Sequence, residues 1–291
     1  NIFDFYTFEG SCALAKKLET WPGGKLVVHI TEMPIKCPVA PLEFAFLADD
    51  YFTKKGMRDK VEISYVTPLS GAFTKEKCTK ALEYLLKDKN IKIVPDFAVE
   101  HIEGENGKMF DYGGEVVDFD LLVTVPTNMG DECILRSGFG DDLNYVPTDK
   151  NTLQSKVKEN IFVIGDATNV PASKAGSVAH FEAEILTENI LKYIEGKPLN
   201  PKFDGHANCF IETGKGKALL IDFNYDVEPL KGKFPFAGIG PLILLEASAF
   251  NHLGKMAFKW VYWNMLLPAR KIPFVTPTMS RAGKKFDEVV G

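Results

Sequence analysis

Residues 160–169 read NIFVIGDATN, and the chain continues through VPASKAG to residue 176. The apolar run Ile161 to Ile164 predicts a buried strand that leads directly into Gly165 and Asp166. After a short loop, Gly176 to Glu195 has the pattern of a helix. A carboxylate at a strand end can bind a ribose or ribityl hydroxyl, and the N–H groups of the next helix favour an anion. A plain strand–turn–helix with an Asp cap has the same pattern.

Upstream of this stretch, strand and helix patterns alternate. Strands are predicted at Lys25 to Ile30, Val61 to Thr67, Ile91 to Pro95 and Leu121 to Val125, and helices at 7–20, Ala40 to Lys54 and Lys75 to Asp88. Three shorter strands, Phe97 to Ile102, Lys108 to Tyr112 and Glu115 to Phe119, predict an antiparallel meander. The β-α-β-α-β order is typical of a nucleotide-binding half of a doubly wound α/β fold.

Composition excludes several classes of protein. The 291 residues carry 34 basic and 39 acidic side chains, a net charge of −5, which disfavours sequence-wide binding of nucleic acid. The five cysteines are widely spaced and do not predict a disulfide framework, and the five histidines have no metal-ligand spacing. No uncharged apolar run of about 18 residues predicts a membrane span. The chain begins at Asn1 without a Met, which we interpret as the start of a fragment.

The segment Ala247 to Phe286 contains seven basic and no acidic residues, within a chain whose net charge is −5. It also contains seven Phe, Trp and Tyr residues. Basic and aromatic side chains together favour a segment lying on an anionic membrane surface. A helix docked on the protein with its lysines in water is the alternative.

The motif IGDATNVPASKAG resembles the second flavin-binding motif of the disulfide-reductase-like flavoproteins. The resemblance implies two Rossmann-type dinucleotide-binding domains, the FAD domain incomplete, plus a C-terminal α+β region. The implied divisions are 1–20 and 125–200 for the FAD domain, 21–124 for the inserted NAD-like domain, and 201–291 for the C-terminal, quinone- and membrane-facing region. The residues implied to bind FAD are Pro38, Pro126, Gly165, Asp166, Ala167, Lys174, Gly176 and Lys255.

The inserted domain lacks the expected nicotinamide motif. In relatives that use NAD, the first strand leads into a GxGxxG turn that seats the pyrophosphate on a helix N-terminus. Here the strand leads into residues 31–38, TEMPIKCP, which contain no glycine and two prolines without N–H groups. The sequence therefore predicts that this domain does not bind a dinucleotide.

Two cysteine contexts, CPVAPLEF from Cys37 and HANCFIETGKGKALLIDFNY around Cys209, resemble the sulfide:quinone oxidoreductases. The resemblance implies that Cys37 and Cys209 form a redox-active pair, with Glu43 assisting proton movement. It also implies that Lys255 lies near the flavin and that Phe258 and Phe210 stack on a quinone. A thiol before a helix also has a lowered pKa. His206 is a second candidate for proton transfer, and Cys12, Cys78 and Cys133 are interpreted as structural or surface thiols.

The implied function is oxidation of sulfide to polysulfide or sulfur by the cysteine pair, with electron transfer through FAD to a membrane quinone. The implied location is the surface of a prokaryotic cytoplasmic membrane, as a peripheral protein. A homo-oligomer is compatible with these features, and the residues do not determine it. Three alternatives stay open: a flavocytochrome c sulfide dehydrogenase subunit, a type II NADH dehydrogenase-like protein, and an inactive fragment without flavin.

Overall fold

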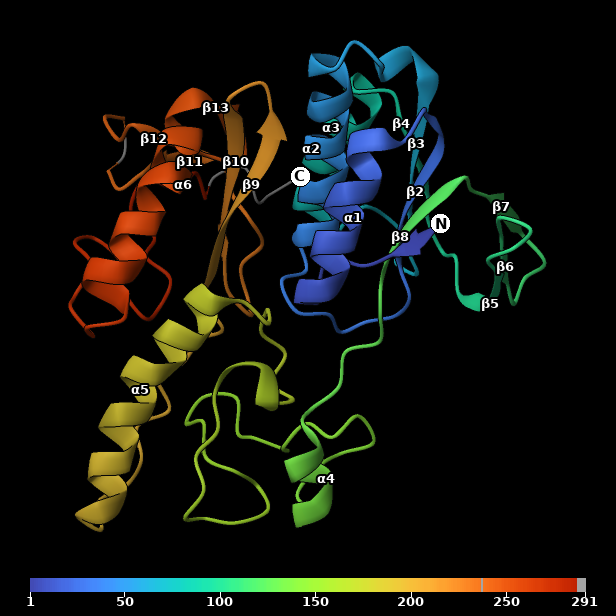
Figure 1. Cartoon of the computed structure of the whole chain (residues 1–291). Helices are drawn as coiled ribbons and strands as arrows, with labels where there is room; N and C mark the ends of the chain where they lie inside the picture. The colour runs from blue at the N-terminus through green and yellow to red at the C-terminus, as the bar shows by residue number, and fades with distance from the viewer. Residues whose placement is uncertain (237, 287–291) are drawn as a thin grey trace. The chain divides into compact units, whose positions relative to one another are not determined.

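The computed structural model describes residues 1–236 and 238–286 (Figure 1). Contacts divide the chain into two compact units. Unit 1 comprises residues 1–35, 39–127 and 211–216, and unit 2 comprises 36–38, 128–210 and the residues from 217 on. Each unit therefore includes a short segment that lies, in the sequence, between two segments of the other unit. The division into four sequence segments given above stays a prediction.

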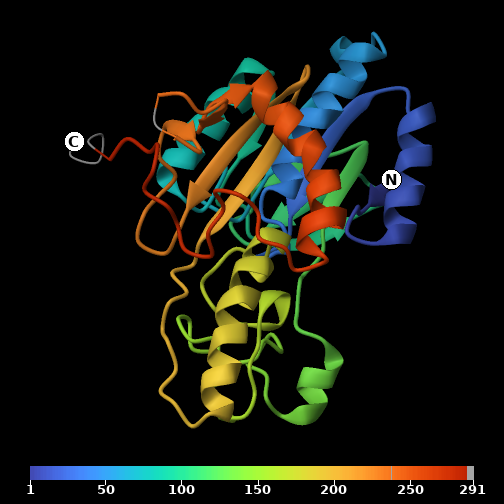
Figure 2. The ribbon, with the colours of Figure 1, turned by 90° about the vertical axis from the view of Figure 1, so that its left-hand side faces the viewer.

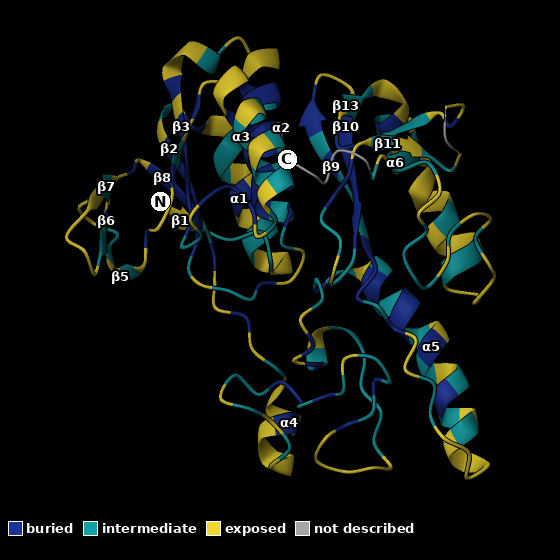
Figure 3. Ribbon diagram, turned by 180° about the vertical axis from the view of Figure 1, so that it is seen from behind, coloured by how far each residue is buried: buried dark blue, intermediate teal, exposed yellow. Residues whose placement is uncertain are grey.

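Unit 1 is built on a parallel sheet with strand order β1-β8-β2-β3-β4. The strands are β1 (Ile2–Phe3), β2 (Gly24–Ile30), β3 (Val61–Val66), β4 (Ile91–Val94) and β8 (Leu121–Val125). Every pairing in this sheet is parallel, with Val28 opposite Tyr65 and Val123. Such a sheet is covered on both faces, which explains the continuous apolar runs of its strands. Figure 3 shows the buried residues concentrated on the central strands.

The helices of unit 1 follow the predicted pattern. They are α1 (Phe8–Thr20), α2 (Ala40–Lys54), the short η1 (Arg58–Lys60) and α3 (Glu76–Asp88). The Thr7 hydroxyl caps α1 by accepting the N–H of Gly10, and Pro41 occupies the first turn of α2. Helix α2 packs on β2 and β3 and buries Leu42, Phe46 and Phe52.

The predicted meander is present as β5 (Val99–Glu103), β6 (Lys108–Asp111) and β7 (Val116–Asp118), paired antiparallel in this order. Its side chains join those of the parallel sheet in one core cluster of Val27, Val66, Val94, Phe97, Met109, Phe119 and Leu122. The small sheet thus covers one face of the large one.

Unit 2 combines several helices, a loop region and a second sheet. Its helices are α4 (Glu132–Ser137), the turn η2 (Gly165–Ala167), α5 (Gly176–Ile194), α6 (Ala249–Val261) and the π-helical turn η3 (Tyr262–Leu266). Its strands are β10 (Lys217–Phe223), β11 (Gly232–Phe234), β12 (Leu242–Leu244) and β13 (Ala247–Ser248), and β9 (Ala207–Gly214) pairs with β10. Helix α6 packs on β10 and β12, and Figure 2 shows it lying across these strands.

The predicted buried strand Ile161 to Ile164 is wrong. These residues are half-buried, and Phe162 makes only an isolated antiparallel bridge to Gln154. The N–H of Val163 donates to the carbonyl of Leu153, and the carbonyl of Ile161 accepts the N–H of Ser155. The segment is therefore tied to a loop rather than to a sheet, because no strand among the described residues extends the pairing.

Candidate functional site

Gly165 makes the turn that the sequence singles out. Its φ of +65° lies in the left-handed region that favours glycine. The Gly165 N–H donates to the Glu182 carboxylate of α5 at 2.6 Å. Burial raises the pKa of Glu182 to about 7, although the N–H of Gly165 and the ammonium of Lys174 oppose this rise. Asp166 and Ala167 follow in η2, with the Asp166 side chain exposed to solvent.

Lys174 is buried and anchors this turn from the other side. Its ammonium donates to the carbonyl oxygens of Asp166 at 3.0 Å and Thr168 at 2.6 Å. It also lies 3.8 Å from the centroid of the Tyr145 ring, a cation–π contact. Burial lowers the pKa of Lys174. Lys174 therefore fixes the backbone of 166–168 in one conformation.

Cys37 lies directly beside the Lys174 turn. The Cys37 N–H donates to the Lys174 carbonyl at 2.7 Å, and Lys36 forms a parallel bridge with Lys174. The N–H of Lys36 donates to the Asn128 side chain at 3.2 Å. The Cys37 backbone has a φ of +47°, and its side chain is exposed. The thiol is not in the first turn of α2, because Val39 is the N-cap of that helix. Cys37 therefore precedes the start of α2 and lies two residues before its N-cap.

Cys209 reaches the same region from β9. The Ser177 hydroxyl, in the first turn of α5, donates to the carbonyl of Asn208 at 2.9 Å. Cys209 is the next residue and is half-buried. Residues 174–177 thus bind the backbone of both cysteine segments, one through Lys174 and the other through Ser177. We call this junction the cysteine site. All five cysteines of the chain are among the described residues.

The remaining cysteines lie elsewhere. Cys78 is buried in α3, as expected of a structural thiol, and Cys133 is exposed on α4. Cys12 is exposed on α1, so it is a surface thiol rather than part of a core.

Glu43 is in unit 1, in the first turn of α2. Its carboxylate accepts the N–H of Glu212 at 3.1 Å, and Glu212 also belongs to unit 1. Pro126 directly follows β8 in unit 1 and is exposed. Pro38 and Gly176 belong to unit 2, and a Cβ built on Gly176 would meet no atom within 4 Å.

Phe210 and Phe258 line one cavity in unit 2, with a volume of about 230 Å³. Apolar side chains from β10, β12, α6 and the segment 272–275 form most of its wall. Gly254 faces the Phe210 ring, and a Cβ there would lie 3.2 Å from its tip. The Lys255 ammonium donates to the carbonyl of Phe210 at 3.4 Å. The structure therefore brings these three predicted residues together, and we call the space the aromatic cavity.

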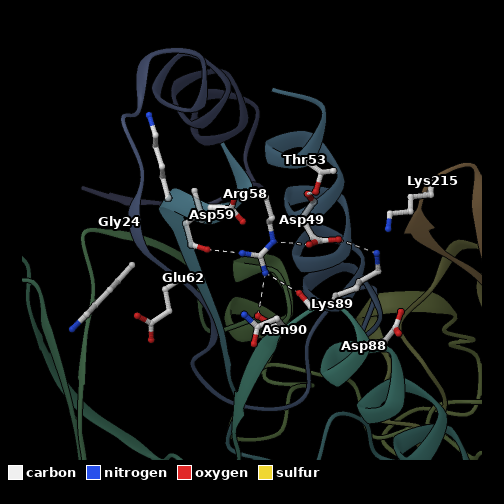
Figure 4. Close-up of a pocket in the computed structure, with 13 residues that line it drawn as sticks. Gly24, Asp49, Thr53, Arg58, Asp59, Glu62, Asp88, Lys89, Asn90 and Lys215 are labelled. Carbon is white, nitrogen blue, oxygen red and sulfur yellow. Dashed lines mark hydrogen bonds and ion pairs between the residues drawn. The ribbon is translucent and has the colours of Figure 1, made fainter. Parts of the chain in front are cut away.

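Sequence patterns did not predict a cluster of charged side chains in unit 1, which is drawn in Figure 4. The Asp49 carboxylate of α2 binds Arg58 at 2.6 Å and Lys89 at 2.9 Å, and Arg58 also donates to the carbonyls of Val61, Lys89 and Asn90. The cluster lies at the amino ends of β3 and β4, whereas ligands of such sheets bind at the carboxyl ends. We interpret it as a structural clamp.

The sequence also missed a second buried cluster, His206, Asp222 and Lys284, although His206 was singled out beside Cys209. The His206 imidazole lies 3.4 Å from Asp222, and the Lys284 ammonium lies 3.0 Å from the same carboxylate. No sequence spacing links these residues, because they come from the residue before β9, from β10 and from the C-terminal segment.

The parallel sheet with its covering helices, joined to a second α/β unit, defines an α/β protein with dinucleotide-binding-like domains. Flavin- and nicotinamide-dependent oxidoreductases commonly have this architecture. No family model matches the chain.

Comparison with known proteins indicates which oxidoreductases this chain resembles. A mitochondrial sulfide:quinone oxidoreductase of Schizosaccharomyces pombe is 31% identical over 90% of the chain and 59% of that protein. The mouse protein of the same name is 27% identical over 87% of the chain and 56% of that protein. The crystal structure of the sulfide:quinone oxidoreductase from Aquifex aeolicus matches with a TM-score of 0.71 and 20% identity, over 90% of the chain and 64% of that chain. This chain is similar to the sulfide:quinone oxidoreductases in sequence and in fold, which confirms the predicted resemblance. The chain spans little more than half the length of these curated relatives.

Proposed function

We propose that this chain carries the sulfide- and quinone-reacting part of an FAD-dependent sulfide:quinone oxidoreductase. The observation that carries the proposal is the junction at residues 174–177, where hydrogen bonds hold the backbones of both cysteine segments. Two cysteines whose backbone segments are bound at one junction can act as a pair, which isolated cysteines cannot. The similarity to the sulfide:quinone oxidoreductases supports the same assignment.

The residues around this junction fit a flavin. Gly165 and Gly176 present backbone without side chains, and Asp166 is exposed. In the part of the chain that the structure describes, no side chain caps the first turn of α5. Such a turn offers N–H groups to an electronegative ligand atom. The residues that would hold FAD are Pro38, Pro126, Gly165, Asp166, Ala167, Lys174, Gly176 and Lys255. When bound, FAD supplies a two-electron acceptor that the side chains of the chain lack.

The sulfur chemistry belongs to Cys37 and Cys209. In the oxidised pair, HS⁻ attacks one sulfur of the disulfide, forms a new S–S bond and releases the other cysteine as a thiolate. One cysteine then carries a persulfide, and the other is a thiolate. A second HS⁻ attacks the outer sulfur of the persulfide, forms a disulfide anion and releases the cysteine as a thiolate. The two cysteines have then together accepted two electrons, which bound FAD would remove to restore the disulfide. Glu43 is the proposed acceptor of a proton from the sulfur species.

The quinone end of the reaction is assigned to the aromatic cavity. Phe210 and Phe258 can stack on a quinone ring, and the apolar wall suits its substituents. The Lys255 ammonium beside Phe210 can stabilise negative charge that develops on a quinone oxygen.

We also propose that α6 and the turn after it lie on a membrane surface, from which a lipid-soluble quinone would enter. Phe250, Leu253, Met256, Trp260 and Trp263 are exposed, and Lys255 and Lys259 are on the same helix. Exposed aromatic and basic side chains together favour an anionic bilayer interface. Among the described residues, no helix is long and apolar enough to cross a membrane. The curated relatives named above are mitochondrial, so the predicted prokaryotic membrane stays a prediction.

A visible spectrum tests the function. The purified chain is mixed with FAD, its flavin bands are followed under anaerobic sulfide, and a water-soluble quinone is then added. We expect the bands to bleach with sulfide and return with quinone. Cys37→Ser and Cys209→Ser should each abolish bleaching, whereas Cys133→Ser, at an exposed thiol, should leave it unchanged. Bound flavin that ignores sulfide would refute the proposed donor.

A test without flavin examines the cysteine pair directly. The chain is oxidised with a thiol oxidant, digested and searched by mass spectrometry for a Cys37–Cys209 cross-link. Anaerobic sulfide should then convert this cross-link into a persulfide on one of the two residues. A pair that never cross-links, while the exposed Cys12 and Cys133 react normally with the same oxidant, would refute the sulfur chemistry.

A further inference from the structure

One wall of the aromatic cavity carries a buried carboxylate. Asp222 of β10 lines the cavity, and only 6% of its surface is exposed. The other polar residues on the cavity wall are Ser177, His180 and Asn208. Ser177 binds the carbonyl of Asn208, and His180 lies 3.3 Å from Glu184 on its own helix. Asp222 is therefore the carboxylate of the cavity.

His206 lies behind this carboxylate in a fixed orientation. Its ring stacks on Phe181 with centroids 4.4 Å apart and an interplanar angle of 2°. Its Nδ1 lies 2.9 Å from the carbonyl oxygen of Thr276, and its Nε2 lies 3.4 Å from Asp222 Oδ2. A carbonyl oxygen can only accept, so Nδ1 carries a proton.

This arrangement requires a further proton. In a neutral imidazole protonated at Nδ1, Nε2 is an acceptor and would present a lone pair to the carboxylate. The contact is favourable only if His206 is an imidazolium or Asp222 is a carboxylic acid. The pair therefore holds one exchangeable proton at the wall of the cavity.

Lys284 completes the cluster. Its ammonium lies 3.0 Å from Asp222 Oδ1 and is almost fully buried, and it also donates to the carbonyl of Ser280. Lys284 therefore pairs with one oxygen of the Asp222 carboxylate, while His206 faces the other oxygen. The charged and titratable groups around Asp222 are thus His206, Lys284 and, across the cavity wall, His180.

We propose that Asp222, with His206 behind it, delivers protons to a quinone in the aromatic cavity. This inference rests on the proposed function. Reduction of a quinone adds two electrons and two protons, so two C=O groups become two C–OH groups. Bound FAD, once reduced, would supply the electron pair, and the pair His206–Asp222 supplies a proton to one oxygen. The pair then regains its proton from water, and the second proton also derives from solvent.

Binding of decylubiquinone and its quinol to the chain alone tests the contact by calorimetry. Asp222→Asn keeps the shape but removes the negative charge and the acid, and we expect it to weaken quinol binding roughly tenfold or more. Asp226→Asn, at an exposed aspartate beyond the same strand, is the matched control and should bind normally. Because Asp222→Asn leaves Lys284 buried without its carboxylate, the double variant Asp222→Asn/Lys284→Gln provides a neutral alternative if the single variant does not fold.

The protein loaded with FAD gives a second readout. After reduction by dithionite, flavin reoxidation by decylubiquinone should slow roughly a hundredfold in Asp222→Asn, the range of general-acid catalysis. Bleaching by sulfide should be unchanged. Dithionite makes this step independent of sulfide, so failure of the sulfide reaction refutes the proposed function and leaves the Asp222 test intact. Equal quinol affinity and equal reoxidation in Asp222→Asn and the unsubstituted chain would overturn the inference, as would absence of quinone binding to the latter.

Discussion

His29 should make unit 1 less stable in mild acid. The side chain is fully buried at the end of β2, where Nδ1 lies 2.9 Å from the Thr124 hydroxyl. Nε2 has no hydrogen-bond partner within residues 1–236 and 238–286. The Phe97 ring packs edge-on at 6.3 Å. Burial lowers the pKa of His29 from 6.5 to about 4, because a charged ring would lose its hydration without gaining a partner.

The sign and size of the effect follow from proton linkage. The unfolded chain binds a proton at His29 below pH 6.5, whereas the folded chain does so only near pH 4. The stability that the neutral ring contributes is therefore complete above about pH 6.5 and is lost as the pH falls toward 4. A fall of about 2.5 in the pKa corresponds to about 3 kcal/mol at about 1.36 kcal/mol per pKa unit.

Urea unfolding at pH 7 and pH 4.5 measures this loss. Trp21 is buried in unit 1 against Phe52 and reports on that unit when Trp260 and Trp263 are replaced by Phe. In this background His29→Asn, which can keep the bond to Thr124, should lose about 2–3 kcal/mol less stability between the two pH values. His101→Asn, at an exposed histidine of β5, is the control. Equal losses with and without His29 would refute the reasoning.

Three further predictions concern the clamp, the turn and the cavity. Asp49→Ala should lower the free energy of unfolding in urea by about 3–5 kcal/mol, because Arg58 and Lys89 lose a buried partner, whereas the exposed Asp59→Ala should change it by less than about 0.5 kcal/mol. Glu182 has a pKa raised by burial to about 7, so stability is lost as the pH rises from 4.5 through 7; Glu182→Gln should abolish this dependence in denaturation curves. Phe258→Ala should weaken decylubiquinone binding by calorimetry about tenfold, and Phe250→Ala, on the same helix outside the cavity, should not; the reverse ranking would contradict the assigned cavity.

Local patterns predicted unit 1 well because its elements are long and strongly periodic. The helix predicted at Ala40 to Lys54 and the strand at Leu121 to Val125 have the same bounds in the structure. Pro41 at a helix start and Gly56 after its end are local signals that need no tertiary context. The apolar run at residues 161–164 has the composition of a strand, but pairing depends on a neighbour that composition does not reveal.

The candidate site was predictable only in part. The resemblance to a known family implied that Cys37 and Cys209 form a pair. How Lys174 and Ser177 bind the two cysteine segments depends on how a turn, a helix start and a strand meet, which no motif describes. The cluster around Asp222 joins residues from distant parts of the chain and has no motif. A buried charge network of this kind forms where packing brings distant residues together, so it produces no periodic pattern in a single sequence.

The interleaving of the two units along the chain constrains synthesis on the ribosome. Unit 1 includes residues 211–216, so it cannot be completed until most of unit 2 has emerged. Residues 36–38, which include Cys37, belong to unit 2 and cannot make their contacts there until the chain from residue 128 on has been synthesised. Such late contacts slow folding and leave early segments exposed. No single cut in the gene would yield either unit whole, and a fragment ending near residue 127 would carry one thiol of the proposed pair without the other.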